Sequence, residues 1–181
     1  MTKVDRRILK SQEAIKKAVI ELMSEKSFDA ITIQDISDKA NVHRATVYLH
    51  YQDKFDLLNR LIQEHIAAMR EITDWACEID WRTATQAFFE YFEQNYLFFS
   101  TMLASKGAPS FRTQFLQFII EEFKEEIDLA GEKNRELSEA AILQYMGNAY
   151  VGVVEWWITN GMPIPPAEMA KQAGILLERT V

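Results

Sequence analysis

The sequence predicts an all-α protein, in which a small N-terminal three-helix head is followed by a longer helical body. Six Gly and four Pro occur in 181 residues, and all six Gly lie at or after Gly107. Such scarcity disfavours a turn-rich β fold. Apolar residues recur at helical spacing in successive segments, and a composition of 48% apolar and 26% charged residues is typical of a globular domain.

The first helix is expected over about residues 5–26. Its apolar residues recur on one stripe, namely Ile15, Ala18, Val19, Leu22 and Met23. Thr32, followed three residues later by Asp35, is a variant capping box and opens a short helix. A second short helix follows over about residues 43–50. Asp53 is a suitable N-cap for a long helix, which should end near a break at residues 75–81.

Four more helices are expected in the body, near residues 83–104, 111–130, 137–159 and 166–179. The segments between them hold the breakers: Gly107 and Pro109 in the first, Gly131 in the second, and Gly161 to Pro165 in the third. There is no internal repeat.

Composition excludes several classes of protein. Cys77 is the one cysteine and has no partner for an internal disulfide, so we expect a reduced, cytoplasmic chain. No segment reaches the ~18 consecutive apolar residues of a membrane span. The N-terminus lacks the apolar core of a signal peptide. Secreted, membrane and disulfide-scaffold proteins are therefore set aside.

The charges are distributed unevenly. The net charge is −7, yet residues 1–54 hold ten Lys/Arg against eight Asp/Glu, while the remaining residues hold ten against nineteen. A basic head on an acidic body is expected of a protein that binds phosphates at one end. A difference of a few charges is also common on ordinary surfaces, so a motif has to decide between the two.

Residues 31–54 supply a motif. Two short helices joined by a tight turn and packed on a longer helix form a helix-turn-helix, whose second helix can enter the major groove of DNA. If Val47 and Tyr51 face inward, the helical rotation turns Tyr48 and Leu49 outward, together with Ala45 and Thr46. Arg44 and His50 lie on the flanks. Arginine recognises guanine edges, a threonine methyl contacts thymine, and hydroxyls bind bases or phosphates.

The segment from Phe28 to Lys54 resembles the DNA-binding signature of the TetR (tetracycline-repressor-like) family of transcriptional regulators. The spacing that carries the resemblance is that of Thr32, Ala40, Val42, Thr46, Tyr48, Tyr51 and Lys54. Three positions depart from the family pattern. Asn41 and Ala45 stand where glycine is usual, and Asn tolerates the left-handed conformation that a turn requires. His43 replaces the usual Ser or Thr, which weakens the cap of the recognition helix.

The resemblance implies a helix-turn-helix domain at about 1–54, with a linking helix from about residue 53, and a helical effector-binding and dimerisation domain at 55–181. It implies a homodimeric regulator, most often a repressor that a small molecule releases from a palindromic double-stranded DNA operator. The candidate DNA-binding residues are Thr32, Gln34, His43, Arg44, Ala45, Thr46, Tyr48, His50 and Lys54. The body is similar to a TetR subfamily common in Gram-positive bacteria, through Asn95–Phe99, Phe111-Arg112 and Trp156-Trp157 to Pro163.

The helix at 137–159 is apolar on two faces. One face can pack in the body's own core, and the other needs a partner. Together with the helix at 166–179 it predicts a four-helix homodimer interface, in which Gly147 and Gly152 allow close approach. Burial of both faces within one monomer is the alternative.

The middle of the body is rich in aromatic residues. Seven of the chain's 21 aromatics lie between Phe88 and Phe99. They form either a dense core or the wall of a pocket for an apolar or aromatic effector. If it is a pocket, its candidate lining residues are Phe89, Phe92, Tyr96, Phe99, Met102, Phe115, Tyr145 and Trp156.

An enzyme is not expected. The sequence contains no G-x-S-x-G, P-loop, G-x-G-x-x-G or H-E-x-x-H motif. The three histidines lie within the first 65 residues and lack the ligand spacing of a metal site, so we expect no cofactor and no metal. The remaining alternatives are an activator with the same fold and a helical module that binds a protein partner without DNA.

Overall fold

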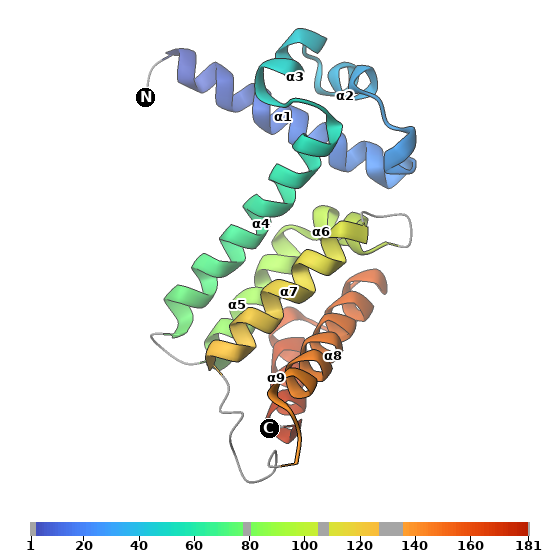
Figure 1. Ribbon diagram of the computed structural model, residues 1–181. Helices are drawn as coiled ribbons and strands as arrows, with labels where there is room; N and C mark the ends of the chain where they lie inside the picture. Colours follow the sequence, from blue (N-terminus) through green and yellow to red (C-terminus); the bar gives the residue numbers. More distant parts are fainter. Residues whose placement is uncertain (1–2, 78–80, 105–108, 127–135, 181) are drawn as a thin grey trace.

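The computed structural model describes residues 3–77, 81–104, 109–126 and 136–180, and all of their regular structure is helical (Figure 1). The prediction of an all-α fold is confirmed. The head contains α1 (Lys3–Glu25), the 3-10 turn η1 (Phe28–Ala30), α2 (Ile33–Ala40) and α3 (Arg44–His50). The body contains α4 (Lys54–Cys77), α5 (Trp81–Gln94), α6 (Tyr96–Leu103), α7 (Pro109–Glu126), α8 (Glu139–Thr159) and α9 (Pro166–Thr180).

Figure 1 shows the arrangement: α1, α2 and α3 form the head at one end of the molecule, and α4 runs from the head down along the body. The body is a bundle of α5 to α9, in which α7 packs on α8 and α5 packs on α9. The head therefore joins the body both through α4 and through contacts between α1 and α6.

The predicted capping box of α2 is present. The Thr32 side chain accepts a hydrogen bond from the Asp35 amide at 3.1 Å, and Asp35 Oδ2 accepts one from the Thr32 amide at 2.8 Å. Lys26 Nζ lies 2.9 Å from the same carboxylate oxygen. These hydrogen bonds, first of all the one from Lys26, lower the pKa of Asp35 to about 2. The helix start is thus fixed by charge-assisted bonds.

The turn between α2 and α3 also follows the sequence. Asn41 has φ 53° and ψ 47°, the left-handed conformation expected of it. The backbone N–H of Asn41 donates to the carbonyls of Ser37 and Asp38, and this ends α2. His43 is the N-cap of α3 and makes no side-chain capping bond, as its replacement of Ser or Thr predicted.

The predicted single helix at 83–104 is wrong, because α5 and α6 are separate helices that meet at Asn95. Asn95 has φ −111° and ψ 29°, and its side-chain amide donates to the Tyr91 carbonyl at 2.9 Å. A side chain that binds its own backbone in this way competes with helix continuation. The break after α4 also begins later than the predicted residue 75, since α4 continues to Cys77.

Other predicted boundaries lie partly outside the described residues, namely the end of the break at 78–80, the separator at 105–108 and the segment 127–135 with Gly131. Ser138 caps α8 through its side chain, with the Ala141 amide as donor.

One hydrophobic core runs from the head into the body. In the body it is built largely from rings in edge-to-face contact, with Phe92 and Phe99 centroids 4.9 Å apart and Phe89 and Trp157 centroids 5.2 Å apart. The Trp157 indole donates to the Ile164 carbonyl at 2.9 Å, which ties the α8–α9 loop to the core.

Gly147 lies on the inner face of α8. A Cβ atom there would stand 2.8 Å from Ile120 Cγ1 and 3.2 Å from Leu116 Cδ1, both on α7. The prediction that Gly147 allows close approach of a second subunit is therefore wrong: it allows close approach of α7 within the same chain. A Cβ atom on Gly152 would meet no atom of the same chain within 4 Å, so Gly152 can still allow a second subunit to approach the outer face of α8.

This difference gives a matched pair of variants. Gly147→Ala should lower the free energy of unfolding by about 1 kcal/mol, because the overpacking of α7 outweighs the gain in helix propensity. For the separated subunit, Gly152→Ala should raise the free energy of unfolding by about 0.5–1 kcal/mol, since within one chain only the helix propensity changes. Urea unfolding of both variants at one protein concentration, low enough to keep the subunits apart, tests this. Equal effects of the two substitutions would show that the packing of α7 on α8 is not as tight as the structure has it.

Candidate nucleic-acid interface

Helix α3 presents two distinct faces. Val47 is fully buried and Tyr51 is 4% exposed, so both face the core of the head as predicted. Tyr48 is 47% exposed and Leu49 is 82% exposed on the opposite side. Arg44 and Ala45 are exposed beside them, and Thr46 is half-buried. An outward surface of mixed apolar and hydrogen-bonding side chains on a short helix suits base edges in a major groove.

Arg44 and Tyr48 are already paired across one helical turn. Arg44 Nη2 donates to Tyr48 Oη at 3.1 Å, and the guanidinium carbon lies 5.5 Å from the ring centroid. Both side chains are thereby held on the same exposed face. Their pairing reduces the conformational freedom that would be lost on binding DNA.

The flanking candidates are occupied to different degrees. His50 is half-buried, and its Nε2 lies 3.0 Å from Ser11 Oγ of α1. Gln34 donates to Asp38 at 2.8 Å, and the Thr32 hydroxyl donates to Asp35 at 2.8 Å. The exposed His43 makes no capping bond. A phosphate contact from the Thr32 hydroxyl would replace its bond to Asp35.

Lys54 makes contacts that its position in the sequence did not reveal. Its ammonium donates to the carbonyls of Phe28, Asp29 and Ile31 at 3.0, 2.9 and 2.9 Å. It also lies 5.0 Å from the Phe28 ring centroid and 5.3 Å from that of Phe55. An ammonium has three donors, and all three are used within the head. Capping by Asp53, in contrast, is as predicted: Oδ1 accepts from the amides of Phe55 and Asp56 at 2.8 Å.

The candidate effector residues do not form one cavity. Phe89, Phe99 and Phe115 are buried and each packs its ring against that of Phe92, and Met102 is buried as well, so side chains fill the space between them. Three other candidates lie at the surface, with Tyr96 37% exposed, Trp156 52% exposed and Tyr145 65% exposed. Placing Tyr145 and Trp156 in one chamber with the buried rings is therefore wrong.

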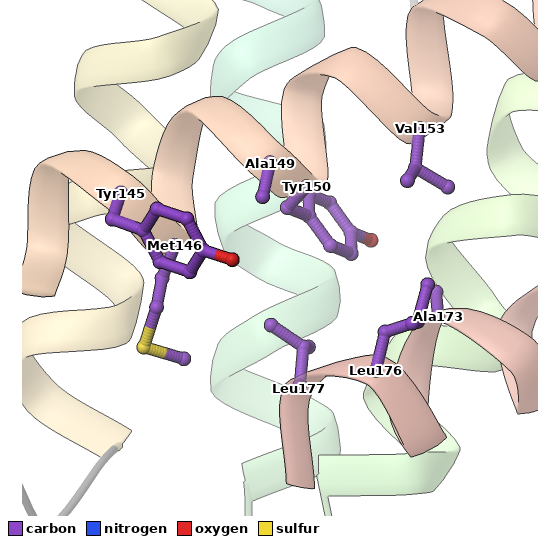
Figure 2. A pocket seen from close by; sticks show the side chains of 8 residues that line it. All are labelled: Tyr145, Met146, Ala149, Tyr150, Val153, Ala173, Leu176 and Leu177. Atoms are coloured by element: carbon purple, nitrogen blue, oxygen red, sulfur yellow. The ribbon is translucent and has the colours of Figure 1, made fainter. Parts of the chain in front are cut away.

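Tyr150 was missed by the sequence analysis. Its hydroxyl lacks a hydrogen-bond partner, unlike the other buried side-chain polar atoms in the described part of the chain. Burial raises the pKa of this phenol. The residue lines a groove of about 120 Å³ between α8 and α9 (Figure 2). The other residues that line it are Tyr145, Met146, Ala149, Val153, Ala173, Leu176 and Leu177.

A cluster of polar side chains lies where the head meets the body. His65 of α4 stacks on Phe98 of α6 with ring centroids 3.7 Å apart, and its Nδ1 lies 2.7 Å from the Tyr91 hydroxyl of α5. Lys16 of α1 forms an ion pair of 2.6 Å with Glu64. Burial, with a smaller contribution from Lys16, lowers the pKa of His65 to about 4, and burial raises that of Tyr91 to about 12.

No group of three or more His, Cys, Asp or Glu in the described residues is placed to bind a metal ion. Over the same residues, no helix is long and apolar enough to cross a membrane.

A helix-turn-helix head on a helical body defines the class of helix-turn-helix transcriptional regulators. Residues 15–61 match the family described as bacterial regulatory proteins, tetR family, and residues 80–179 match the transcriptional regulator C-terminal region. The second match covers more than half of the chain. The chain therefore belongs to the TetR family, whose members are DNA-binding transcriptional regulators, mostly repressors.

Two curated relatives match part of the chain. An uncharacterised helix-turn-helix regulator of Bacillus subtilis, YxbF, is 43% identical over 65 residues, which are 35% of this chain and 17% of YxbF. The dhaKLM operon activator DhaS of Lactococcus lactis is 26% identical over 89 residues, which are 49% of this chain and 46% of DhaS. The chain thus spans less than half the length of either relative.

Solved structures share the fold over nearly the whole chain. A TetR regulator from Streptococcus agalactiae has a TM-score of 0.68 at 24% identity and covers 96% of both chains. The structure of a dihydroxyacetone kinase operon activator DhaS also has a TM-score of 0.68, at 21% identity, and covers 94% of this chain and 96% of its own.

The buried His65 predicts a pH dependence of stability. Its folded pKa lies below the ordinary value of 6.5, so the unfolded chain takes up a proton that the folded chain does not. Stability is therefore full above pH 6.5 and falls as the pH drops toward 4, by up to about 3 kcal/mol from this group. Urea unfolding at pH 7, 6, 5 and 4 should show a shallower pH slope for His65→Gln than for the wild type. His43→Gln, an exposed position, is the control, and parallel curves for wild type and His65→Gln would contradict the assignment.

Proposed function

We propose that the chain regulates transcription as a homodimer that binds a palindromic DNA operator, and that a small apolar or aromatic effector releases it. The observation that carries the proposal is the exposed face of α3, which presents Arg44, Tyr48 and Leu49. The opposite face is anchored in the core of the head by Val47, and by Tyr51 directly after the helix. In this proposal residues 1–54 act as the DNA-binding unit, and residues 55–181 hold the effector and the partner subunit.

The proposed DNA contacts fall into two groups. Arg44, Tyr48 and Leu49 would face base edges, with the neighbouring Ala45 and Thr46 close to the groove wall. His43 and His50, at the two ends of α3, and Gln34 would contact phosphates and fix the orientation of the helix. We assign Thr32 and Lys54 mainly to the internal hydrogen bonds they make. A phosphate would have to displace Asp35 from the Thr32 hydroxyl, and three carbonyls from the Lys54 ammonium.

We propose that two subunits meet along the outer stripe of α8. Tyr145, Ala149, Gly152 and Trp156 recur at i, i+4, i+7 and i+11, on one side of the helix. Tyr145 and Trp156 are large, apolar and more than half exposed, and Gly152 leaves open space. Leu176 of α9, 51% exposed, lines the adjoining groove, while Met169 and Ala173 are buried within the monomer. Apolar surface of this kind is typical of permanent dimers.

The effector would bind in the body by opening the aromatic core. Tyr150 supports this proposal, because its buried hydroxyl has no partner and could hydrogen-bond to a ligand that otherwise makes apolar contacts. A ligand that binds more tightly to a subunit arrangement unsuited to DNA would weaken operator binding. By linkage, the operator would weaken binding of the ligand by the same factor.

Activation in place of repression is the second candidate. The Lactococcus lactis relative is named as an operon activator, and its likeness to this chain is limited to 26% identity over 89 residues. Repression and activation use the same DNA contacts, since the difference depends on where the operator lies relative to the promoter. A module that binds only a protein partner would use the exposed face of α3 without enriching any DNA sequence.

Selection from a random duplex library with the full chain tests the proposal. We expect a two-fold symmetric site, with an affinity that falls steeply with salt. On that duplex Arg44→Ala and Tyr48→Ala should each weaken binding by about 1–3 kcal/mol, measured by fluorescence anisotropy.

Arg179→Ala removes an exposed cation from α9 and is the matched control, with an affinity expected to stay at the wild-type value. If no sequence is enriched even at low salt, the DNA-binding proposal fails and a protein partner becomes the better explanation.

The dimer face is tested by introducing charge. Trp156→Glu should weaken dimerisation at least 100-fold, because the two-fold axis would bring two buried carboxylates close together. Sedimentation velocity over a range of concentrations measures this. Trp75→Glu, which changes a tryptophan of α4 that is 55% exposed, should leave the dimer intact. Dissociation by Trp75→Glu alone would place the interface elsewhere.

A further inference from the structure

The first turns of α1 extend beyond the rest of the head. In Figure 1 the N-terminal end of α1 projects past α3. The contact of Ser11 Oγ with His50 Nε2, at 3.0 Å, places Ser11 beside the C-terminal end of α3. Residues 6–10 precede that contact and are all exposed. They therefore lie next to one edge of the proposed DNA-binding surface. We name residues 6–10 the α1 arm.

The arm continues the stripe of α1 that faces the head. Ile15 is fully buried, Ser11 one turn earlier is half-buried against His50, and Arg7 one turn before that is exposed. Residues four apart lie on the same side of a helix. By this spacing Arg7 lies on the side of α1 that faces α3, one turn before the contact of Ser11 with His50. A cation takes the place that an apolar residue holds further along the stripe.

The three cations of the arm have no carboxylate partner in the described part of the chain. Among the described residues, no hydrogen bond or ion pair joins Arg6, Arg7 or Lys10 to a carboxylate, whereas several other exposed cations are paired. Examples are Arg60 with Asp56 at 2.8 Å and Arg112 with Glu155 at 3.2 Å. Cations near the start of a helix also oppose its dipole, which lowers the stability of α1. The arm is therefore built for something other than folding.

We propose that the α1 arm binds phosphates of the operator on the outer side of each half-site, beyond the C-terminal end of α3. The inference rests on the proposed function, since it needs α3 in a major groove. Arg6 and Lys10, the two ends of the arm, lie about 6 Å apart along the helix axis, at 1.5 Å per residue. With 3.4 Å per nucleotide along one strand, the arm covers about two phosphates. It adds affinity without adding sequence preference.

The experiment uses two duplexes that carry the operator selected with the wild-type chain. One extends about ten base pairs beyond each half-site, and the other ends at the outer edge of the half-sites. Three full-length proteins are titrated on both over a series of salt concentrations: wild type, the triple variant Arg6→Gln/Arg7→Gln/Lys10→Gln, and Arg6→Lys/Arg7→Lys. Lys17→Gln is the matched control. It removes an exposed cation from the same helix, about 10 Å along the axis beyond the end of the arm.

On the long duplex, the triple variant should bind at least tenfold more weakly than the wild type at low salt. Its slope of log affinity against log salt should be shallower by about 2 per half-site, at about 0.9 per phosphate contact. On the short duplex, the two proteins should bind alike. Arg6→Lys/Arg7→Lys and Lys17→Gln should match the wild type on both duplexes, and circular dichroism should show the same helix content in all four proteins.

Wild-type affinity and slope for the triple variant on the long duplex would overturn the inference while leaving the proposed function intact. An equal loss on both duplexes would overturn it too, because the arm would then act inside the half-site or through the fold. Failure of the wild type to bind any selected duplex would refute the proposed function and the arm's role with it.

Discussion

The proposed DNA-binding surface depends on the ammonium of the half-buried Lys54, at the start of α4. Its three hydrogen bonds to the carbonyls of Phe28, Asp29 and Ile31 join the connection between α1 and α2 to the first turn of α4. Those carbonyls lie in and just after η1, outside the α-helices, and the ammonium donates to each of them; the Phe28 carbonyl also accepts the Ile31 amide. The position of α2, and through it of α3, is thereby fixed relative to the long helix that enters the body.

Helix α4 also joins the head to the body further along its length, at His65. One face of α4 holds His65 among Phe98, Tyr91 and the nearby Lys16, so α1, α5 and α6 all contact one point of it. A body whose aromatic core is filled can respond to a ligand only by repacking, and α6 and α4 are the elements through which repacking reaches the head. In the proposed function this would couple effector binding to operator binding through packed side chains, without a long-range charge effect.

The head could be predicted from sequence because its signals are local. The cap at Thr32, the left-handed Asn41, and the inward Val47 and Tyr51 each depend on residues a few positions away. The body was less predictable. Apolar spacing continues across Asn95, so the end of α5 depends on a side-chain bond that no periodicity shows. Two apolar stripes on α8 cannot reveal which one meets α7, and aromatic residue types do not distinguish a filled core from a pocket.

Hydrogen exchange of the free chain tests most directly whether contacts within the protein preform the DNA-binding surface. In the wild type, amides of α2 and α3 should be protected in the absence of DNA. In Lys54→Met they should exchange much faster, while amides of α7 and α8 keep their wild-type protection, because the substitution removes one hydrogen-bond donor from each of three carbonyls in the head alone. Unprotected α2 and α3 amides in the wild type, or unchanged protection in Lys54→Met, would contradict the account.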